Sequence, residues 1–316
     1  MKIFCTLGPS SLNKSFLNFS NKKISLLRLN MSHVKLSKLA STIKFIKKYS
    51  SVPICIDTEG AQIRTKTKKK KFLKKNNILI INKNSNAFKF YPQEVFNQLR
   101  KKDILDIGFK GLKVKIYKVL PDRIYSRVIN SGLLEDSQGV HLVNRNIKLN
   151  FVTEKDLEAI KIAKKLKIKH FALSFTNTYQ DILKFNNLLK KEKKIFKIET
   201  KNAIKNLNKI LTGGEMFLID RGDLSKDTSI ENIPHIQRKI ISQAIKKKKE
   251  VYVATNFLES MLVNKYPTRG EANDIYSTLE SGAAGLVLAG ETAIGPHARE
   301  CVIFIKKMIK VFKKNK

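Results

Sequence analysis

The sequence of 316 residues contains no tryptophan, only seven prolines, and 26 acidic residues against 63 lysines and arginines. No apolar run approaches the roughly 20 residues that a membrane-spanning helix needs, so we expect neither a membrane span nor a membrane partner. The first residues also lack the basic, apolar and small-residue zones of a signal peptide. Hydrophobic residues still make up 42% of the chain, which predicts a soluble, cytoplasmic protein with a substantial core.

Cysteine is also scarce, with three residues spread over the whole chain. Cys5 and Cys55 lie inside apolar, strand-like runs, and Cys301 stands far from both. This spacing fits neither a disulfide framework nor a metal-binding motif. We therefore expect the three thiols to pack in the core, where a free cysteine behaves as a small hydrophobe.

Positive charge is in large excess, with a net charge of +37. Clustered Lys and Arg would suggest a nucleic-acid partner. Only ten of the 63 basic residues are Arg, however, and the lysines are scattered along the chain. A/T-biased codon usage explains the same composition, so nucleic acid is not the expected partner, and whether the excess is functional or mutational stays open. We interpret the densest lysine run, residues 66–75, as a solvated hairpin or loop.

Short apolar runs alternate with amphipathic helical patterns along most of the chain. The apolar runs are residues 3–7, 25–29, 53–56, 171–175, 195–198, 216–219, 251–254 and 286–288. Helical patterns separate most of them, at residues 34–48, 153–166, 182–191, 233–247 and 269–280. Eight strands that alternate with helices predict a (β/α)₈ barrel, an α/β fold with its active site at the C-terminal ends of the strands.

One interval breaks this rhythm. Residues 66–149 contain short period-two stretches and turns, such as residues 112–116 and 123–129. They predict a β-rich lid domain inserted after the third strand, with the barrel formed by residues 1–65 and 150–316. Because the helical pattern after the eighth run reaches the last residues, we expect no further domain.

Polar residues follow each apolar run. They occupy residues 6–10, 28–33, 57–64, 174–175, 197–199, 221–223, 254–256 and 290–293. Lys197 and Glu199 are two residues apart on one run and should share a face of the strand. Asp223 follows the next run, in an Arg-Gly-Asp tip. Two carboxylates and one ammonium could thus converge on an anionic, metal-dependent substrate.

In this order, and over nearly the whole chain, these segments resemble the motifs of the pyruvate kinase family. The resemblance implies transfer of a phosphoryl group from phosphoenolpyruvate to ADP, which gives pyruvate and ATP in glycolysis. It further implies that Glu199 and Asp223 hold Mg²⁺, that Lys197 stabilises the moving phosphoryl group, and that Arg28 holds phosphate. The residues it assigns to catalysis are Lys197, Arg28, Thr255 and Arg64.

The resemblance also implies a substrate subsite and a K⁺ site. Main-chain N–H groups of the Arg-Gly-Asp tip would receive the substrate carboxylate, and the substrate-binding residues are Gly222, Asp223, Ser174 and Arg221. The K⁺ ligands would be Asn30, Ser32, Asp57 and the carbonyl of Thr58. A homodimer through the barrel is compatible with this resemblance. The family's C-terminal regulatory domain has no counterpart in this sequence, so no sugar-phosphate activation is expected.

Several positions depart from the family pattern. A serine that helps to deliver a proton is Ala289 here, a lid lysine is Gln138, and a glutamate that tracks the K⁺ requirement is Gln62. These changes leave full activity, nucleotide affinity and K⁺ dependence open. The alternatives are a catalytically weak homologue with a binding role and a basic phosphate- or nucleic-acid-binding protein on the same barrel.

Duller interpretations of single residues also stay open. A carboxylate at a strand end can simply cap the next helix. Lys197 can pair structurally with Glu199, and Arg28 with Asp57.

Overall fold

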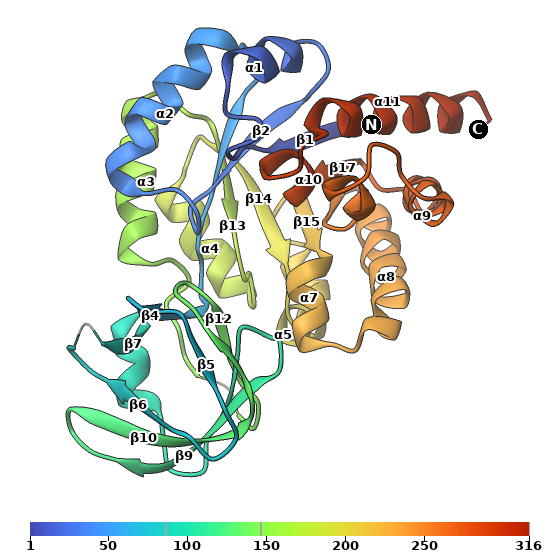
Figure 1. The fold of residues 1–316 in the computed structure, drawn as a ribbon. Helices are drawn as coiled ribbons and strands as arrows, with labels where there is room; N and C mark the ends of the chain where they lie inside the picture. Colours follow the sequence, from blue (N-terminus) through green and yellow to red (C-terminus); the bar gives the residue numbers. More distant parts are fainter. Residues whose placement is uncertain (86, 146, 316) are drawn as a thin grey trace. The chain divides into compact units, whose positions relative to one another are not determined.

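The computed structural model describes residues 1–85, 87–145 and 147–315. It divides into two compact units (Figure 1). The first combines Met1–Gly60 with Glu154–Lys316, and the second is Ala61–Thr153. No helix in the described ranges combines the length and the apolar character that crossing a bilayer requires.

The first unit is a closed barrel of eight parallel strands, in the order β1-β17-β16-β15-β14-β13-β3-β2. Its strands are β1 (Lys2–Thr6), β2 (Leu26–Asn30), β3 (Ile54–Asp57), β13 (His170–Leu173), β14 (Lys193–Ile198), β15 (Met216–Asp220), β16 (Glu250–Ala254) and β17 (Gly285–Leu288). All eight apolar runs therefore form barrel strands, which confirms the predicted (β/α)₈ fold. The strands are apolar on both faces because helices cover the outside and side chains fill the inside.

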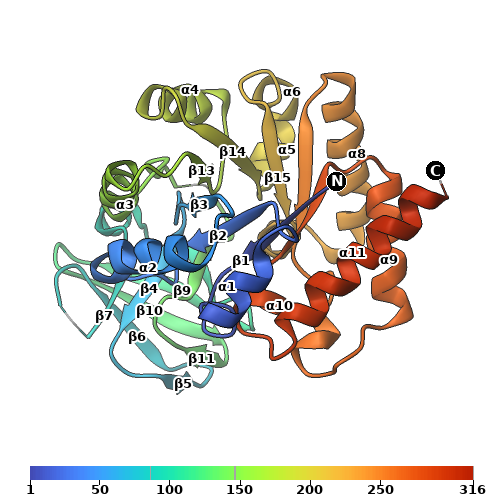
Figure 2. The ribbon, with the colours of Figure 1, turned by 90° about the horizontal axis from the view of Figure 1, so that it is seen from above.

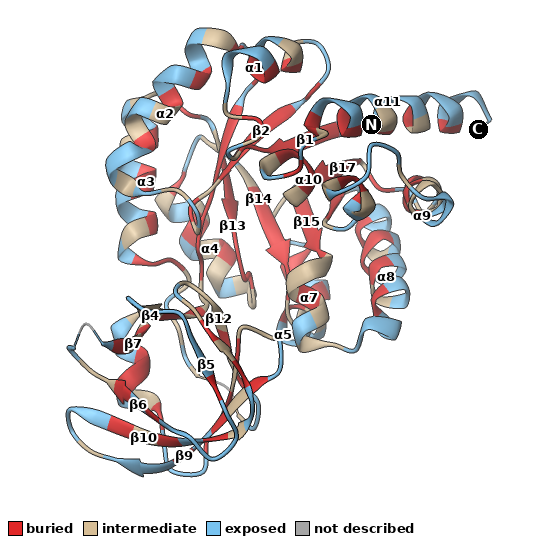
Figure 3. Ribbon diagram, viewed as in Figure 1, coloured by how far each residue is buried: buried red, intermediate tan, exposed pale blue. Residues whose placement is uncertain are grey.

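Helices surround the barrel (Figure 2). They are α1 (Lys14–Ser20), α2 (Leu36–Tyr49), α3 (Glu154–Lys165), α4 (Tyr179–Leu188), α5 (Lys201–Lys205), α6 (Leu207–Ile210), α7 (Arg221–Asp227), α8 (Ile233–Lys246), α9 (Arg269–Glu280), α10 (Gly290–Ala293) and α11 (Ala298–Lys314), with short 3₁₀ turns η2 (Ile230–Asn232) and η3 (Glu259–Leu262). Figure 3 shows that the strands are mostly buried, whereas the longer helices are buried along one side only.

Side-chain capping explains why one helix begins earlier than the sequence pattern predicts. The helix expected at residues 182–191 begins at Tyr179, because Thr178 and Asp181 form a capping box. The Asp181 amide donates to Thr178 Oγ1 at 3.2 Å, and Asp181 Oδ2 accepts from the Thr178 amide at 2.8 Å. Side-chain capping of this kind determines the first turn more strongly than apolar periodicity does.

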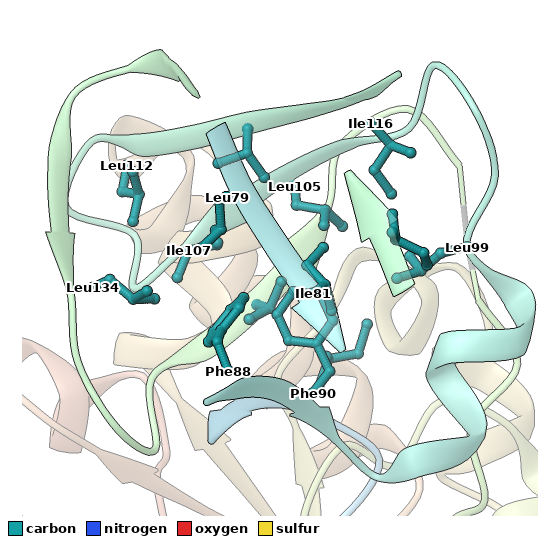
Figure 4. Packing of buried hydrophobic residues seen from close by; sticks show 14 of the residues in the cluster. Leu79, Ile81, Phe88, Phe90, Leu99, Leu105, Ile107, Leu112, Ile116 and Leu134 are labelled. Carbon is teal, nitrogen blue, oxygen red and sulfur yellow. The ribbon is translucent and has the colours of Figure 1, made fainter. Parts of the chain in front are cut away.

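The second unit is antiparallel. A seven-stranded sheet has the order β6-β10-β9-β8-β12-β4-β7, and β11 pairs with β5. Its elements are β4 (Ile63–Thr67), β5 (Lys71–Leu73), β6 (Ile78–Asn82), β7 (Phe88–Tyr91), η1 (Gln93–Gln98), β8 (Ile104–Ile107), β9 (Leu112–Val119), β10 (Arg123–Asn130), β11 (Gly132–Leu134) and β12 (Gly139–Leu142). Alternate residues of these strands, such as Leu105, Ile107 and Ile81, form its core (Figure 4).

The lysine run lies in this unit. Lys66 is on β4 and Lys71 is on β5, and these two strands pair with different neighbours. The run is therefore not a single hairpin, although most of its side chains are exposed as expected. The three cysteines are free and buried in the first unit, which confirms their packing role.

Candidate active site

The candidate site lies where the barrel strands end, and the two-residue period of the strands builds it. A layer of apolar side chains fills the barrel interior, and it includes Leu26, Cys55, Ala172, Ile195 and Leu218. Two residues further along the same strands the inward positions become polar or charged. These positions are Arg28, Asp57, Ser174, Lys197 and Asp220. Successive side chains alternate between faces, so the polar residues lie directly above the apolar layer.

Arg28 and Asp57 form a buried ion pair in this polar layer. Arg28 Nε lies 2.5 Å from Asp57 Oδ2, and Arg28 Nη1 donates to Thr6 Oγ1 at 3.1 Å. Burial alone would lower the pKa of Arg28, but Asp57 and Asp220 outweigh it and raise that pKa. The structural ion pair between Arg28 and Asp57 is thus present, and one Arg28 nitrogen, Nη1, reaches the neighbouring strand β1.

Lys197 is the centre of the cluster. Its ammonium lies 2.7 Å from Glu199 Oε1 and 3.5 Å from both Asp57 Oδ2 and Asp220 Oδ2. It also donates to Ser174 Oγ at 3.2 Å. Burial would lower the pKa of Lys197, but Asp57 and Glu199 raise it above its ordinary value. Lys197 is therefore a fixed positive charge among three carboxylates.

Ser174 connects this cluster to the end of β3. Its hydroxyl contacts the Thr58 carbonyl at 2.7 Å and Asp57 Oδ1 at 3.2 Å. Its amide donates to Thr58 Oγ1 at 3.0 Å. The predicted site residues Ser174, Asp57 and Thr58 are therefore brought together with Lys197.

Three carboxylates form an acidic cluster at the ends of β14 and β15. Oxygens of Glu199, Asp220 and Asp223 all lie within 4.8 Å of one another. Glu199 is 1% exposed, and its Oε2 accepts from the Phe175 amide at 2.6 Å. Burial raises the pKa of Glu199 to about 8, with Lys197 opposing this shift and Asp223 and Asp220 adding to it.

The acidic cluster has the donor set that a divalent cation needs. Glu199 Oε1 is buried, and among the described residues its one contact is the Lys197 ammonium at 2.7 Å. Hard cations such as Mg²⁺ prefer carboxylate oxygens, and a bound cation would offset the repulsion that raises the pKa of Glu199. The residues present therefore fit a Mg²⁺ ion.

Asp220 belongs to this cluster although the sequence did not predict a role for it. Burial would raise its pKa, but Lys197, Arg28 and Lys226 outweigh burial and lower it. The two-residue period of a strand could have indicated that Asp220 points inward, because it follows the inward-facing Leu218 by two residues.

The Arg-Gly-Asp tip forms the first turn of helix α7 and not a loop. The Gly222 amide donates to Thr255 Oγ1 at 2.8 Å. The Arg221 guanidinium donates to the Thr255 carbonyl at 3.0 Å and binds Asp274 through two hydrogen bonds of 2.9 and 2.7 Å. The Arg221 side chain therefore holds the β16 loop, where Thr255 has an unusual positive φ of 73°.

The proposed K⁺ ligands lie at two adjoining strand ends. Asn30 and Asp57 are register partners on β2 and β3. Asn30 Oδ1 accepts from the Ser32 amide at 3.0 Å, and the Thr58 carbonyl accepts from Ser174. The K⁺ site itself stays a prediction.

Arg64 and Gln138 lie in the second unit. Arg64 is on β4, where Nη1 donates to the Ser137 carbonyl at 3.3 Å. The Gln138 side chain accepts from the Glu135 amide at 2.9 Å and donates to the Leu133 carbonyl at 3.1 Å. Gln138 therefore stabilises its own turn, and the catalytic role of Arg64 stays a prediction.

Comparisons with known proteins agree with this fold. The family model described as "Pyruvate kinase, barrel domain" matches residues 1–302. A pyruvate kinase of Staphylococcus aureus (strain MRSA252) is 31% identical over 320 residues, which is 95% of this chain and 55% of that protein. A pyruvate kinase of Thermotoga maritima is 29% identical over 326 residues, 98% of this chain and 70% of that protein.

A solved structure is similar over almost the whole chain. The crystal structure of Cryptosporidium parvum pyruvate kinase aligns with a TM-score of 0.90 at 26% identity, covering 99% of this chain and 70% of that one. The chain thus spans between about half and 70% of the length of these relatives.

Proposed function

The chain belongs to the pyruvate kinase family, and on this basis we propose that it transfers the phosphoryl group of phosphoenolpyruvate to ADP. The products are ATP and pyruvate, and we place the reaction in cytoplasmic glycolysis. One observation carries the proposal: Lys197 lies 2.7 Å from Glu199 in the polar layer, next to the acidic cluster. This arrangement offers a positive charge and a cation site to one anionic substrate.

Positive charge is what phosphoryl transfer requires. The transition state spreads negative charge over the equatorial oxygens of the phosphoryl group, and catalysis depends on positioning and electrostatic stabilisation. Lys197 and Arg28 would bind these oxygens, since both are buried and held in place by carboxylates. Mg²⁺ held by Glu199 and Asp223 would neutralise further charge on the substrate oxygens.

The substrate carboxylate would lie at the start of α7. Gly222 has no internal reason to be a glycine, because a Cβ there would meet Asp220 Oδ1 at 3.4 Å and Thr255 Cγ2 at 3.5 Å, both ordinary contacts. A close approach of a ligand to this backbone accounts for the missing side chain. When the substrate binds, the Gly222 amide would exchange its hydrogen bond to Thr255 Oγ1 for one to the carboxylate.

Protonation of the enolpyruvate carbon completes the reaction. When the phosphoryl group moves to the terminal phosphate of ADP, the enolate left behind takes up one proton and becomes pyruvate. We assign delivery of this proton to the hydroxyl of Thr255, through solvent, because Ala289 lacks the hydroxyl that the family pattern has there. A monovalent cation at Asn30, Ser32, Asp57 and Thr58 would add positive charge beside the transferred group.

The direct test is pyruvate formation by the purified protein from phosphoenolpyruvate and ADP with Mg²⁺, in K⁺ or Na⁺ buffer. Lys197→Ala should lower kcat by about 10²- to 10³-fold, the loss expected when a main stabiliser of transition-state charge is removed. The control Lys193→Ala changes an exposed lysine on the same strand and should keep activity. Wild-type turnover that Lys197→Ala leaves unchanged would contradict the proposal.

A second candidate function is ligand binding with little turnover. Two observations favour it: Ala289 supplies no hydroxyl, and the Gln138 side chain is engaged in its own turn. In that case calorimetry would detect phosphoenolpyruvate and Mg²⁺ binding at one site per chain. The purified protein would form no pyruvate from phosphoenolpyruvate and ADP.

A further inference from the structure

Asp220 is buried beside Glu199 and Asp223, the two carboxylates that the proposed function assigns to Mg²⁺. The contacts of its own carboxylate are long. Its carboxylate contacts Thr255 Oγ1 at 3.4 Å and Lys197 Nζ at 3.5 Å, both near the long limit for a hydrogen bond. By comparison, Glu199 accepts from the Phe175 amide at 2.6 Å. The oxygens of Asp220 therefore remain available to a cation.

We propose that Asp220 is a third carboxylate ligand of the divalent cation, and that it allows the cation to bind before any anionic substrate. The identity of that substrate rests on the proposed function, whereas cation binding rests on geometry. Oxygens of Glu199, Asp220 and Asp223 lie within 4.8 Å of one another. The buried Glu199 Oε1 has one contact among the described residues, the Lys197 ammonium at 2.7 Å, so a lone pair of this oxygen remains for a cation.

A count of charges shows what Asp220 contributes. The positive charge of Arg28 neutralises the negative charge of Asp57, whose Oδ2 lies 2.5 Å from Arg28 Nε. With the cation bound and Glu199 ionised, the three carboxylates of the acidic cluster carry three negative charges, which Lys197 and one divalent cation balance. Without Asp220, Lys197 and the cation would leave one positive charge in excess, and a stable site would need the substrate anion.

Lys226 also contacts this cluster, from its rim. Its ammonium lies 2.5 Å from Asp223 Oδ1, and its side chain is 35% exposed. An exposed lysine pairs weakly, and its flexible side chain can turn to solvent when a cation takes its place. The order of binding follows: the cation occupies the site first, and a phosphate-bearing substrate then meets a neutral site that contains a metal.

Mn²⁺ is a suitable probe, because it prefers the same oxygen ligands as Mg²⁺ and its binding can be followed by electron paramagnetic resonance. The titration uses the full chain without phosphoenolpyruvate or nucleotide. Asp220→Asn keeps the size of the side chain and removes its charge. Glu231→Gln removes the charge of an exposed acid on η2 and is the matched control. Asp220→Ala is measured in parallel.

We expect the wild-type protein to bind one Mn²⁺ and Asp220→Asn to raise the Kd at least about tenfold, as loss of a group that supports a metal does. Glu231→Gln should leave the Kd unchanged. If the Asp220 variants fail to fold, anomalous scattering from Mn²⁺ in wild-type crystals decides, and an Asp220 oxygen should lie in the coordination sphere. A Kd that Asp220→Asn leaves unchanged, or a bound Mn²⁺ without Asp220 as a ligand, would overturn the proposal.

The two proposals can fail separately. If Mn²⁺ affinity depends on Asp220 but no pyruvate forms, the metal inference stands and the proposed function does not. If pyruvate forms while Asp220→Asn lowers only kcat and not Mn²⁺ affinity, Asp220 is a positioning residue for Lys197 and the inference is wrong.

Discussion

The amide of Gly222 donates a hydrogen bond of 2.8 Å to the hydroxyl of Thr255 and so joins the start of α7 to the end of β16. Arg221 strengthens the same junction by donating to the Thr255 carbonyl. Two consecutive residues with positive φ, Thr255 and Asn256, form the turn on the β16 side. The junction places the Thr255 hydroxyl and the first amides of α7 at the edge of the acidic cluster.

Gly222→Ala should leave the fold intact and weaken substrate binding. The added methyl group would have ordinary contacts of 3.4 Å or more within the chain, but it would occupy the space in which we place the substrate carboxylate. We expect a higher KM for phosphoenolpyruvate with little change in melting temperature. Gly270→Ala, in the first turn of α9 with its nearest neighbour at 3.9 Å, is the control and should retain the KM. Equal KM values for both variants would argue against this placement of the carboxylate.

Ala289→Ser should raise kcat. The added hydroxyl would restore the proton-delivering group that the family pattern has at this position, and general acid catalysis typically contributes about 10²- to 10⁴-fold. Thr255→Val should lower kcat for the same reason. Steady-state pyruvate formation measures both effects, and solvent deuterium should slow the Thr255→Val protein more than the wild type if protonation has become rate-limiting. A kcat that is insensitive to both substitutions would exclude these positions from proton delivery.

Glu199→Gln should change how stability depends on pH. The pKa of Glu199 is raised by burial to about 8 in the folded protein. Its stabilising effect is therefore present below the unfolded pKa of a carboxyl group and is lost as the pH rises through about 8. Glutamine mimics the protonated form, so the variant should gain melting temperature relative to wild type between pH 5 and pH 8.5, measured with a chelator. A constant difference across this range would show that Glu199 is ionised throughout.

Arg28→Met should destabilise the barrel. Among the described residues, the substitution leaves the fully buried carboxylate of Asp57 with the longer contact to Lys197 and with the hydroxyl of Ser174. Removal of one partner of a buried ion pair costs about 3–5 kcal/mol of unfolding free energy. Urea denaturation of the double variant Arg28→Met/Asp57→Asn should recover part of the loss. A double variant as unstable as the sum of both single variants would show that the two residues are not coupled.

The repeating elements of the fold follow from local pattern. Eight apolar runs and their helices predict the barrel because strand and helix periodicity is a property of neighbouring residues. Boundaries depended on capping instead, as Thr178 shows at the start of α4. The short helix α7 was not predicted because apolar periodicity needs more residues than its seven.

The sequence alone determined the order in which polar residues follow the barrel strands, and from this order we predict that the chemistry belongs to Lys197, Glu199, Asp223, Arg28, Asp57 and Ser174. Only the tertiary structure decided which of them meet, because closure of the barrel brings together the ends of strands that are far apart in the chain. The tertiary structure adds Asp220 to the acidic cluster and pairs the Arg221 side chain with Asp274 and the Thr255 carbonyl. It also places the buried ammonium of Lys197 among three carboxylates. Such contacts depend on distances between strands, and those distances exist only once the backbone hydrogen bonds of all eight strands have formed.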